Sequence, residues 1–253
     1  MSPETALLVG SSYSAVPLLF ALRRQGLRVE VCGNLETDPC HGLADASHFI
    51  DYSDSDTLAA LVANGRYDYL VPSCNDYAYM AATAVAARQG FPGYDTEATA
   101  ELLFQKRQFR QFASAHGLSV PRSASDLCAV ELAQLTCPLL VKPVDSFSGR
   151  GVTRVEQAAH LEPAVIEARN ASRSGEYVIE EFVTGSLHSH SAFLRQGAIS
   201  LDFFVDEFCS VYPYQVDCSN HPSRLDPALC NRLREEITRL ARLANLADGL
   251  LHT

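Results

Sequence analysis

The first ninety residues alternate between short apolar runs and segments with helical spacing, and this alternation limits the fold more than any other feature. The apolar runs are ALLVG (6–10), RVEVCG (28–33), HFIDY (48–52) and YDYLVPS (67–73). Helices are predicted between or after these runs, over residues 14–25, 57–64 and 76–90. Because parallel strands need crossover connections, this order predicts an open parallel sheet with helices on both faces.

The pattern changes in the second half of the chain. Residues 94–116 predict two helices with a break near Phe104-Gln105-Lys106, and a short helix is expected over 127–135. CPLLVKPV (137–144) and GVTRV (151–155) predict two antiparallel strands, and EYVIEEFV (176–183) a third, with a helix over 157–170 between them. These elements are typical of an α+β arrangement rather than a continued parallel sheet.

The last part of the chain predicts antiparallel strands followed by a long helix. Residues 187–217 alternate apolar and polar positions, which predicts three strands with a turn at Gln196-Gly197. Asp226-Pro227 has the composition of a helix start, and Asp248-Gly249 is expected to end the helix. Its predicted apolar face consists of Leu229, Leu233, Ile237, Leu240 and Ala244. GLLHT (249–253) predicts the start of a further strand; we expect a natural chain that continues, with a short terminal strand as the alternative.

Charge and composition exclude several classes of protein. A net charge of −10 argues against a nucleic-acid partner, which requires a basic surface. No apolar run has membrane-spanning length, and the N-terminus lacks the basic flank of a signal peptide. The eight cysteines form no C-x-x-C pair, so zinc spacing is absent. We therefore expect buried free thiols in a cytoplasmic protein without a membrane partner.

The stretch VKPVDSFSGRGV (141–152) has the composition of a phosphate-binding loop but fits no common nucleotide motif. A Walker A loop requires Gly-Lys followed by Ser or Thr at the start of a helix, whereas Val152 follows Gly151. Lys142 lies in an apolar run and needs an anionic partner or an outlet to water. Gly149 and Gly151 would let backbone N–H groups approach phosphates. A glycine hairpin beside a surface lysine explains these residues equally well.

The order of the pieces resembles the ATP-grasp superfamily. Lys106 lies on a helix, and VKP, a glycine-rich hairpin loop, EEFVTG and antiparallel strands follow it. The resemblance covers essentially the whole chain and implies a Rossmann-like parallel α/β domain followed by an ATP-grasp fold of two α+β subdomains, the second incomplete. The implied segments are an N-terminal domain (1–95), a helical connection (96–121), a small subdomain (122–184) and a large subdomain (185–253).

The resemblance implies a role for each matching position. Lys106 corresponds to a lysine that contacts phosphate, and Lys142 to one that bridges the adenine side and the α-phosphate. The loop that closes over the β- and γ-phosphates corresponds to Ser146, Ser148, Gly149 and Gly151. The segment that binds adenine corresponds to Glu180, Glu181, Phe182 and Val183. Catalytic roles are predicted for Lys142, Ser148, Gly149 and, in a polar loop, Arg224.

The chemistry implied is ATP-dependent activation of a carboxylate. ATP would convert the carboxylate to an acyl phosphate, which an amine or another nucleophile then attacks, with Mg²⁺ as metal cofactor. The expected partners are therefore small-molecule carboxylates and amines, and a homodimer is left open. Two alternatives remain: an ATP-binding module without turnover, and a carboxylase-like component of a larger assembly.

Two features depart from the family pattern. Leu187 stands where a ribose-binding glutamate is usual, and the Mg²⁺ ligands are expected beyond Thr253, so none is assigned here. Asp202, Asp206 and Glu207 could substitute as oxygen ligands, although a solvated strand face is the preferred interpretation. Spacing puts His188 and His190 on one strand face, where we expect them to line a cleft or face solvent rather than bind metal. Arg224 could bind a substrate carboxylate and His221 could transfer a proton, or the loop could be a simple turn.

Overall fold

The computed structural model describes residues 3–253. The chain forms two compact units, one ending at Glu101 and the other beginning at Leu102. None of the helices described within 3–253 is both long and apolar enough to cross a membrane.

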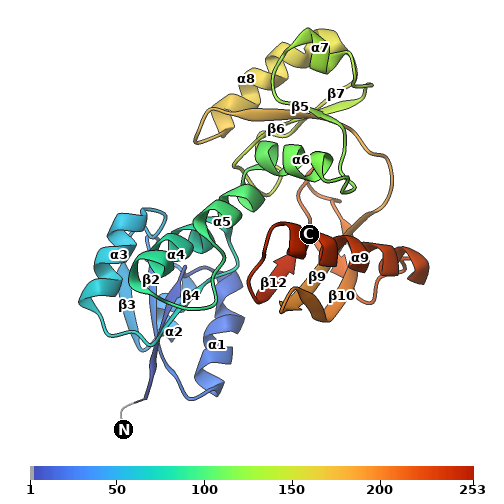
Figure 1. Ribbon diagram of the computed structural model, residues 1–253. Helices are drawn as coiled ribbons and strands as arrows, with labels where there is room; N and C mark the ends of the chain where they lie inside the picture. Colours follow the sequence, from blue (N-terminus) through green and yellow to red (C-terminus); the bar gives the residue numbers. More distant parts are fainter. Residues whose placement is uncertain (1–2) are drawn as a thin grey trace. The chain divides into compact units, whose positions relative to one another are not determined.

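The N-terminal unit is built on a four-stranded parallel sheet of order β3-β2-β1-β4 (Figure 1). Its strands are β1 (Thr5–Val9), β2 (Arg28–Gly33), β3 (Ala46–Phe49) and β4 (Tyr69–Pro72). The predicted parallel sheet is therefore confirmed. The third strand begins two residues earlier than predicted, because its pairing with β2 runs from Ala46 to Phe49.

Helices cover both faces of this sheet, as predicted. They are α1 (Val16–Arg24), α2 (Pro39–Leu43), α3 (Ser55–Asn64) and α4 (Asp76–Gln89), with a 3-10 turn at Tyr13–Ala15. Alternate residues of β1 point to opposite faces, so Leu8 packs in the core with α1 and α2, whereas Leu7 and Val9 pack in the core with α3 and α4. The five-residue α2 was not predicted, because one turn is too short to show a helical period.

The C-terminal unit begins with two consecutive helices, α5 (Glu97–Phe104), which crosses from the first unit, and α6 (Lys106–Ala115). The predicted break falls at Gln105. An antiparallel sheet of order β5-β8-β6-β7 follows, with α7 and α8. The bounds are β5 (Ser123–Ala124), α7 (Ala129–Leu132), β6 (Leu139–Pro143), β7 (Thr153–Val155), a 3-10 turn (Ala158–His160), α8 (Leu161–Ala171) and β8 (Tyr177–Glu181). The predicted antiparallel pairing of β6 with β7 is confirmed.

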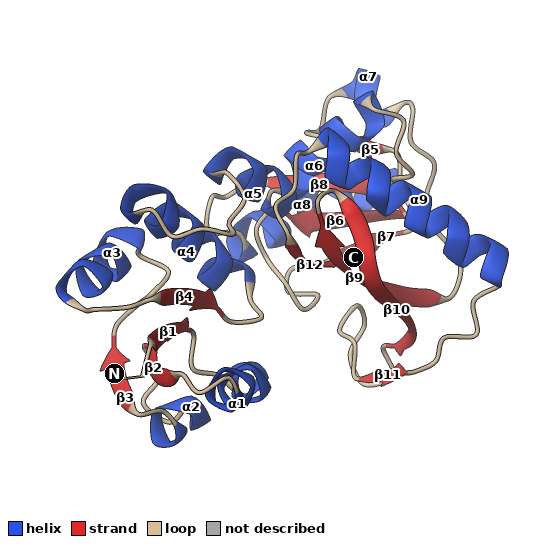
Figure 2. Ribbon diagram, turned by 60° about the horizontal axis from the view of Figure 1, so that its bottom comes forward, coloured by secondary structure: helices blue, strands red, loops and turns tan. Residues whose placement is uncertain are grey.

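A second antiparallel sheet, of order β11-β10-β9-β12, completes this unit, and α9 lies along it (Figure 2). Its elements are β9 (Leu187–Arg195), β10 (Ala198–Phe208), β11 (Cys218–Asn220), α9 (Pro227–Leu243) and β12 (Gly249–His252). The carboxylate of Asp226 accepts a hydrogen bond from the Ala228 N–H at 2.7 Å, which confirms the predicted helix start. β12 pairs with β9, so GLLHT does form a strand.

Two boundaries in this region were predicted wrongly. The third strand of the meander begins at Cys218 rather than within 187–217, because residues 209–217 form a loop closed by the Asp217 carboxylate. The long helix ends at Leu243, not at Asp248-Gly249, because Asn245 adopts a left-handed backbone with φ of 51°. Asparagine tolerates this conformation better than most residues and can end a helix as glycine does.

The cysteine prediction was half right. All eight cysteines are free, but only Cys32 and Cys40 are buried. Four others, Cys74, Cys128, Cys137 and Cys218, are exposed. Burial raises the pKa of the Cys32 thiol to about 12, so this thiol is protonated and unreactive at neutral pH.

The turn between β9 and β10 provides a test of the fold. Gln196 and Gly197 have φ of 53° and 71°, as a two-residue hairpin of type I′ requires. The nearest atom to a Cβ built on Gly197 is 3.9 Å away, so the Gly197→Ala change meets backbone strain but no clash. We expect it to lower the free energy of unfolding by about 1 kcal/mol in urea titrations.

The matched control for this turn is Gly249→Ala. Nothing lies within 4 Å of a Cβ at Gly249, and the backbone there is not left-handed. Equal stability losses in the two variants would contradict the turn assignment.

Candidate nucleotide site

Lys142 lies on β6 and forms an ion pair with Glu180 of β8. The distance from Lys142 Nζ to Glu180 Oε2 is 2.6 Å, and the Glu180 side chain is 1% exposed. Strand alternation explains the placement: Val141 and Ile179 point into the core with α8, so Lys142 and Glu180 point to the opposite face. The expectation that Lys142 needs an anionic partner is confirmed.

Arg110 of α6 supplies a second cation to the same carboxylate. Its Nε donates to Glu180 Oε1 at 2.8 Å. Burial raises the pKa of Glu180, but the Lys142 ammonium and the Arg110 guanidinium outweigh this effect and hold the pKa below its usual range. Glu180 is thus ionised at neutral pH, and it ties β6, β8 and α6 together.

Lys106 opens α6 and holds the start of the glycine-rich loop. Its Nζ donates to the carbonyl oxygens of Ser146 at 2.5 Å and Val144 at 3.5 Å. Its backbone N–H also donates to the Val144 carbonyl oxygen, at 3.2 Å. The two predicted lysines therefore contact the same strand–loop segment, one from within it and one from the helix.

The loop itself is a tight turn packed against neighbouring chain. Ser148, Gly149 and Gly151 have φ of 55°, 71° and 69°, and Ser146 Oγ donates to the Arg150 carbonyl at 2.9 Å. A Cβ on Gly149 would lie 2.8 Å from the Tyr214 carbonyl oxygen. A Cβ on Gly151 would clash with Pro143 and Ala171. Both glycines thus have a packing reason in addition to any role at phosphate.

The predicted adenine segment follows β8. Glu181 accepts two hydrogen bonds from the Arg122 guanidinium, at 2.7 and 2.9 Å, and one from the Thr136 N–H at 2.7 Å. The Phe182 N–H donates to the Pro138 carbonyl, and the Arg154 guanidinium lies 4.2 Å from the Phe182 ring centre. Val183 is 68% exposed. The roles of these residues toward adenine remain predictions.

The carboxylates of β10 do not form a solvated face, so that interpretation was wrong. Asp206 is 4% exposed and accepts from Ser223 Oγ at 2.5 Å, from Arg224 Nε at 3.1 Å and from His188 Nδ1 at 2.9 Å. Asp202 accepts from His190 Nε2 at 2.8 Å and from Arg234 Nε at 2.7 Å. Asp202 and Asp206 lie on one face of β10, and they bind partners on β9, the 221–226 loop and α9.

His190 is inside rather than lining a cleft or facing solvent, whereas His188 is partly exposed and His221 is exposed. His190 is 4% exposed and stacks on Phe204 with ring centres 4.0 Å apart. His221 lies with Nδ1 at 3.1 Å from the Phe204 carbonyl oxygen. Within residues 3–253, no three His, Cys, Asp or Glu side chains are grouped so as to hold a metal ion.

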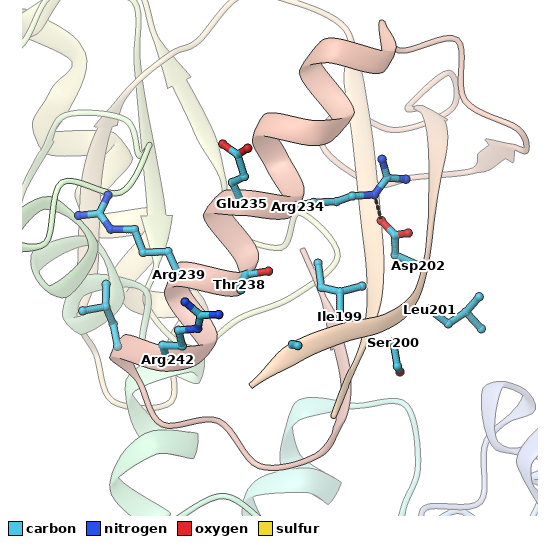
Figure 3. A pocket seen from close by; sticks show the side chains of 11 residues that line it. Ile199, Ser200, Leu201, Asp202, Arg234, Glu235, Thr238, Arg239 and Arg242 are labelled. Carbon is cyan, nitrogen blue, oxygen red and sulfur yellow. Dashed lines mark hydrogen bonds and ion pairs between the residues drawn. The ribbon is translucent and has the colours of Figure 1, made fainter. Parts of the chain in front are cut away.

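A hollow of about 930 Å³ lies between α9 and β10 (Figure 3). Its α9 wall carries Arg234, Glu235, Thr238, Arg239 and Arg242, and its β10 wall runs from Ala198 to Asp202. Arg239 donates to the carbonyl oxygens of His116 and Gly117, and Arg234 to Asp202. None of the predicted nucleotide residues lines this hollow, so the candidate site is defined by the lysines and the loop.

Sequence reasoning missed Arg110 and Tyr214. Arg110 lies one helical turn after Lys106 on α6, a spacing visible in the sequence, but its partner Glu180 is seventy residues away. Tyr214 has φ of 63° and presents its carbonyl to Gly149. Nothing in the sequence around Tyr214 marks such a contact.

Comparisons with known proteins fit this geometry. The chain is 30% identical over 190 residues to formate-dependent phosphoribosylglycinamide formyltransferase of Burkholderia pseudomallei (strain 668), a match covering 72% of this chain. The solved biotin carboxylase domain of Hydrogenobacter thermophilus 2-oxoglutarate carboxylase superposes with a TM-score of 0.81 at 16% identity, over 98% of this chain and 60% of that one. The chain belongs to the ATP-grasp superfamily.

Two further solved members of this superfamily share the fold. L-amino acid ligase from Bacillus licheniformis has a TM-score of 0.78 at 18% identity, covering 99% of this chain and 62% of that one. An ADP complex of N5-carboxyaminoimidazole ribonucleotide synthetase has a TM-score of 0.79 at 17% identity, covering 100% and 66%.

This ATP-grasp chain spans about half the length of the curated relatives it matches, 47% of the Burkholderia protein and 51% of a Synechococcus sp. (strain CC9902) protein of the same description. A search of protein-family models found no match.

The Glu180 ion pairs generate a stability prediction. Glu180→Gln removes the charge that two cations share inside the fold, and we expect a loss of about 3–5 kcal/mol in the free energy of unfolding. Glu181→Gln is the matched control at the next residue. Its partner Arg122 is 64% exposed, so solvent screens this pair and we expect a much smaller loss. Similar losses in both variants would contradict a special role for the buried carboxylate.

The same carboxylate predicts an acid response. The folded-state pKa of Glu180 is lowered from the ordinary value of 4.5, so the pairing stabilises the fold fully above that pH. As the pH falls below about 4.5, the unfolded chain takes up a proton that the folded chain still excludes, and stability declines. Urea titrations across this range should show a shallower decline for Glu180→Gln than for the parent chain. Parallel declines would contradict the assignment.

Proposed function

We propose that the chain is the ATP-binding part of a ligase that activates a carboxylate as an acyl phosphate for attack by an amine. The observation that carries this proposal is the convergence of Lys106 and Lys142 on one strand–loop segment beside the 180–183 segment. The named activities of the relatives support the choice of substrate: their descriptions include formate, the bicarbonate anion and amino acids.

The lysine count strengthens the proposal. The whole chain contains two lysines, Lys106 and Lys142, against eighteen arginines. Arginine and lysine are not interchangeable, because an ammonium is a compact point charge with three rotatable donors. The presence of lysine at these two positions alone is consistent with a need for an ammonium group beside phosphate oxygens.

The chain's own groups fit a nucleotide phosphate. Lys142 has its ammonium on Glu180 and a side chain 20% exposed, so it keeps donors for a phosphate oxygen. We propose that Ser146, Ser148, Gly149 and Gly151 face the phosphates and that exposed Val183 borders adenine. Arg224, with a side chain 82% exposed, is retained as a proposed contact for the substrate carboxylate. These groups would orient ATP and neutralise charge as phosphate is transferred.

Magnesium is the proposed metal partner of ATP, as in the MgADP complex described for the Hydrogenobacter protein. Within 3–253 no group of three His, Cys, Asp or Glu side chains is placed to hold a metal by protein ligands alone, whereas Mg²⁺ beside a nucleotide is usually held by one or two carboxylates together with the phosphates. No step is therefore assigned to the metal.

A second candidate function is an ATP-binding module without turnover, which the lysine and loop contacts fit equally well. Both functions require ATP binding, but they differ in ADP release when a carboxylate and an amine are supplied.

We further propose a homodimer in the cytoplasm. One related structure is described as a biotin carboxylase domain dimer. Eight free cysteines, four of them exposed, are consistent with a reducing compartment. Sedimentation equilibrium of the purified chain measures the oligomeric state directly.

Amine labelling provides a sharp test of ATP binding. With two lysines in the chain, an amine-directed reagent and peptide mapping report on Lys106 and Lys142 separately. We expect ATP to slow modification of Lys142, and Lys142→Ala to weaken ATP binding in calorimetry by at least about tenfold, or about 1.4 kcal/mol. Arg195→Ala removes an exposed positive charge elsewhere in the same unit and serves as the control. Unchanged affinity in Lys142→Ala would rule out the assignment.

Ligase activity is tested by ADP release with panels of carboxylates and amines, using the chain with Mg²⁺ and ATP. Release that requires both substrates supports the ligase. Tight ATP binding with no release for any pair supports the binding module instead.

A further inference from the structure

Three side chains at one end of β9 and β10, shortly after the 180–183 segment, are joined in a row by hydrogen bonds. Ser186 Oγ lies 2.6 Å from His188 Nε2, and His188 Nδ1 lies 2.9 Å from Asp206 Oδ1. Ser186 and His188 are two residues apart, so they share one side of the strand, and Asp206 is the direct cross-strand partner of His188. The arrangement thus follows from strand register.

The ionised carboxylate of Asp206 determines which ring nitrogen of His188 carries the proton. Hydrogen bonds from Ser223, then Arg224 and His188, lower the pKa of Asp206 to about 2, so its carboxylate is ionised and can only accept. His188 Nδ1 must therefore donate to Asp206. In the neutral ring, Nε2 then carries the lone pair and accepts the Ser186 O–H. This is the tautomer that a general base requires.

Asp206 is held in place from several directions. Ser223 Oγ donates at 2.5 Å, the Arg224 backbone N–H at 3.1 Å and Arg224 Nε at 3.1 Å. With these partners fixed, Asp206 in turn fixes the orientation of the His188 ring.

Accessibility increases from the carboxylate to the hydroxyl. The side chains of Asp206 and His188 are 6% and 19% exposed, and Ser186 is exposed. Nothing lies within 4 Å of a Cβ built on the neighbouring Gly185. The Arg224 guanidinium borders the cluster with most of its surface in solvent. A small acyl compound could therefore reach Ser186 Oγ.

We propose that Ser186, His188 and Asp206 form an acyl-transfer site with Ser186 as the nucleophile, accepting small activated esters. This activity needs no ATP, and it shares Arg224 with the proposed ligase function.

The reaction balances with water as the only co-reactant. Ser186 Oγ bonds to the carbonyl carbon while its proton passes to His188 Nε2, and the bond to the leaving alcohol breaks as His188 returns the proton to that oxygen. Water then attacks the acyl-serine through the same base, releasing the carboxylic acid and restoring Ser186. Arg224 would stabilise the transient oxyanion by its charge.

The test uses the full chain with two probes, a fluorophosphonate that labels activated serines and p-nitrophenyl acetate. We expect the fluorophosphonate label on the peptide containing Ser186 and p-nitrophenol release without ATP. Ser186→Ala should abolish both. His188→Gln should slow both by at least about 100-fold, which is the usual contribution of a general base.

Ser219→Ala is the matched control, since Ser219 is an exposed serine on β11 of the same sheet, and it should change neither rate. Thermal unfolding confirms that each variant is folded. A folded parent chain that neither labels at Ser186 nor releases p-nitrophenol would overturn the proposal and leave the cluster as a brace for the 221–224 loop. Equal labelling in His188→Gln would overturn the role of His188 as base.

Discussion

The buried carboxylate of Glu180 is the interaction on which the candidate nucleotide site depends. It lies between the Lys142 ammonium and the Arg110 guanidinium at hydrogen-bond distances, almost fully removed from water. An isolated charge in that position would cost more than the fold could offset, so the three groups are stable only together. The carboxylate thereby fixes three elements to one another: β8, which leads into the predicted adenine segment, β6, which carries Lys142, and α6, which carries Lys106.

Much of the fold could be predicted because its signals are local. The parallel sheet follows from runs such as RVEVCG, and the helix start at Asp226-Pro227 follows from residue chemistry that acts within one turn. The misplaced boundaries have local causes that the patterns do not show: Asn245 ends α9 by adopting a left-handed backbone, and the Asp217 carboxylate closes a loop where a strand was expected.

The site was less predictable, because its partners are distant in sequence. The lysines and glycines could be chosen from their order along the chain, but the pairing of Arg110 with Glu180 depends on the docking of α6 on β8. The carboxylates of β10 were misread as solvated, because strand alternation gives the face of a side chain and not what covers it. Here the 221–226 loop and α9 cover that face, and Ser223, Arg224 and Arg234 neutralise it.

Helix α6 contacts both parts of the candidate nucleotide site through its first turn. Lys106 binds the carbonyls at the start of the glycine-rich loop, and Arg110, one turn later, binds the carboxylate that pairs with Lys142. A rigid helix transmits a tilt to both contacts at once. The position of the glycine-rich loop and the electrostatic environment of Lys142 therefore depend on the same helix. A substitution that reorients α6 would change the proposed phosphate contacts and the Glu180 ion pairs together.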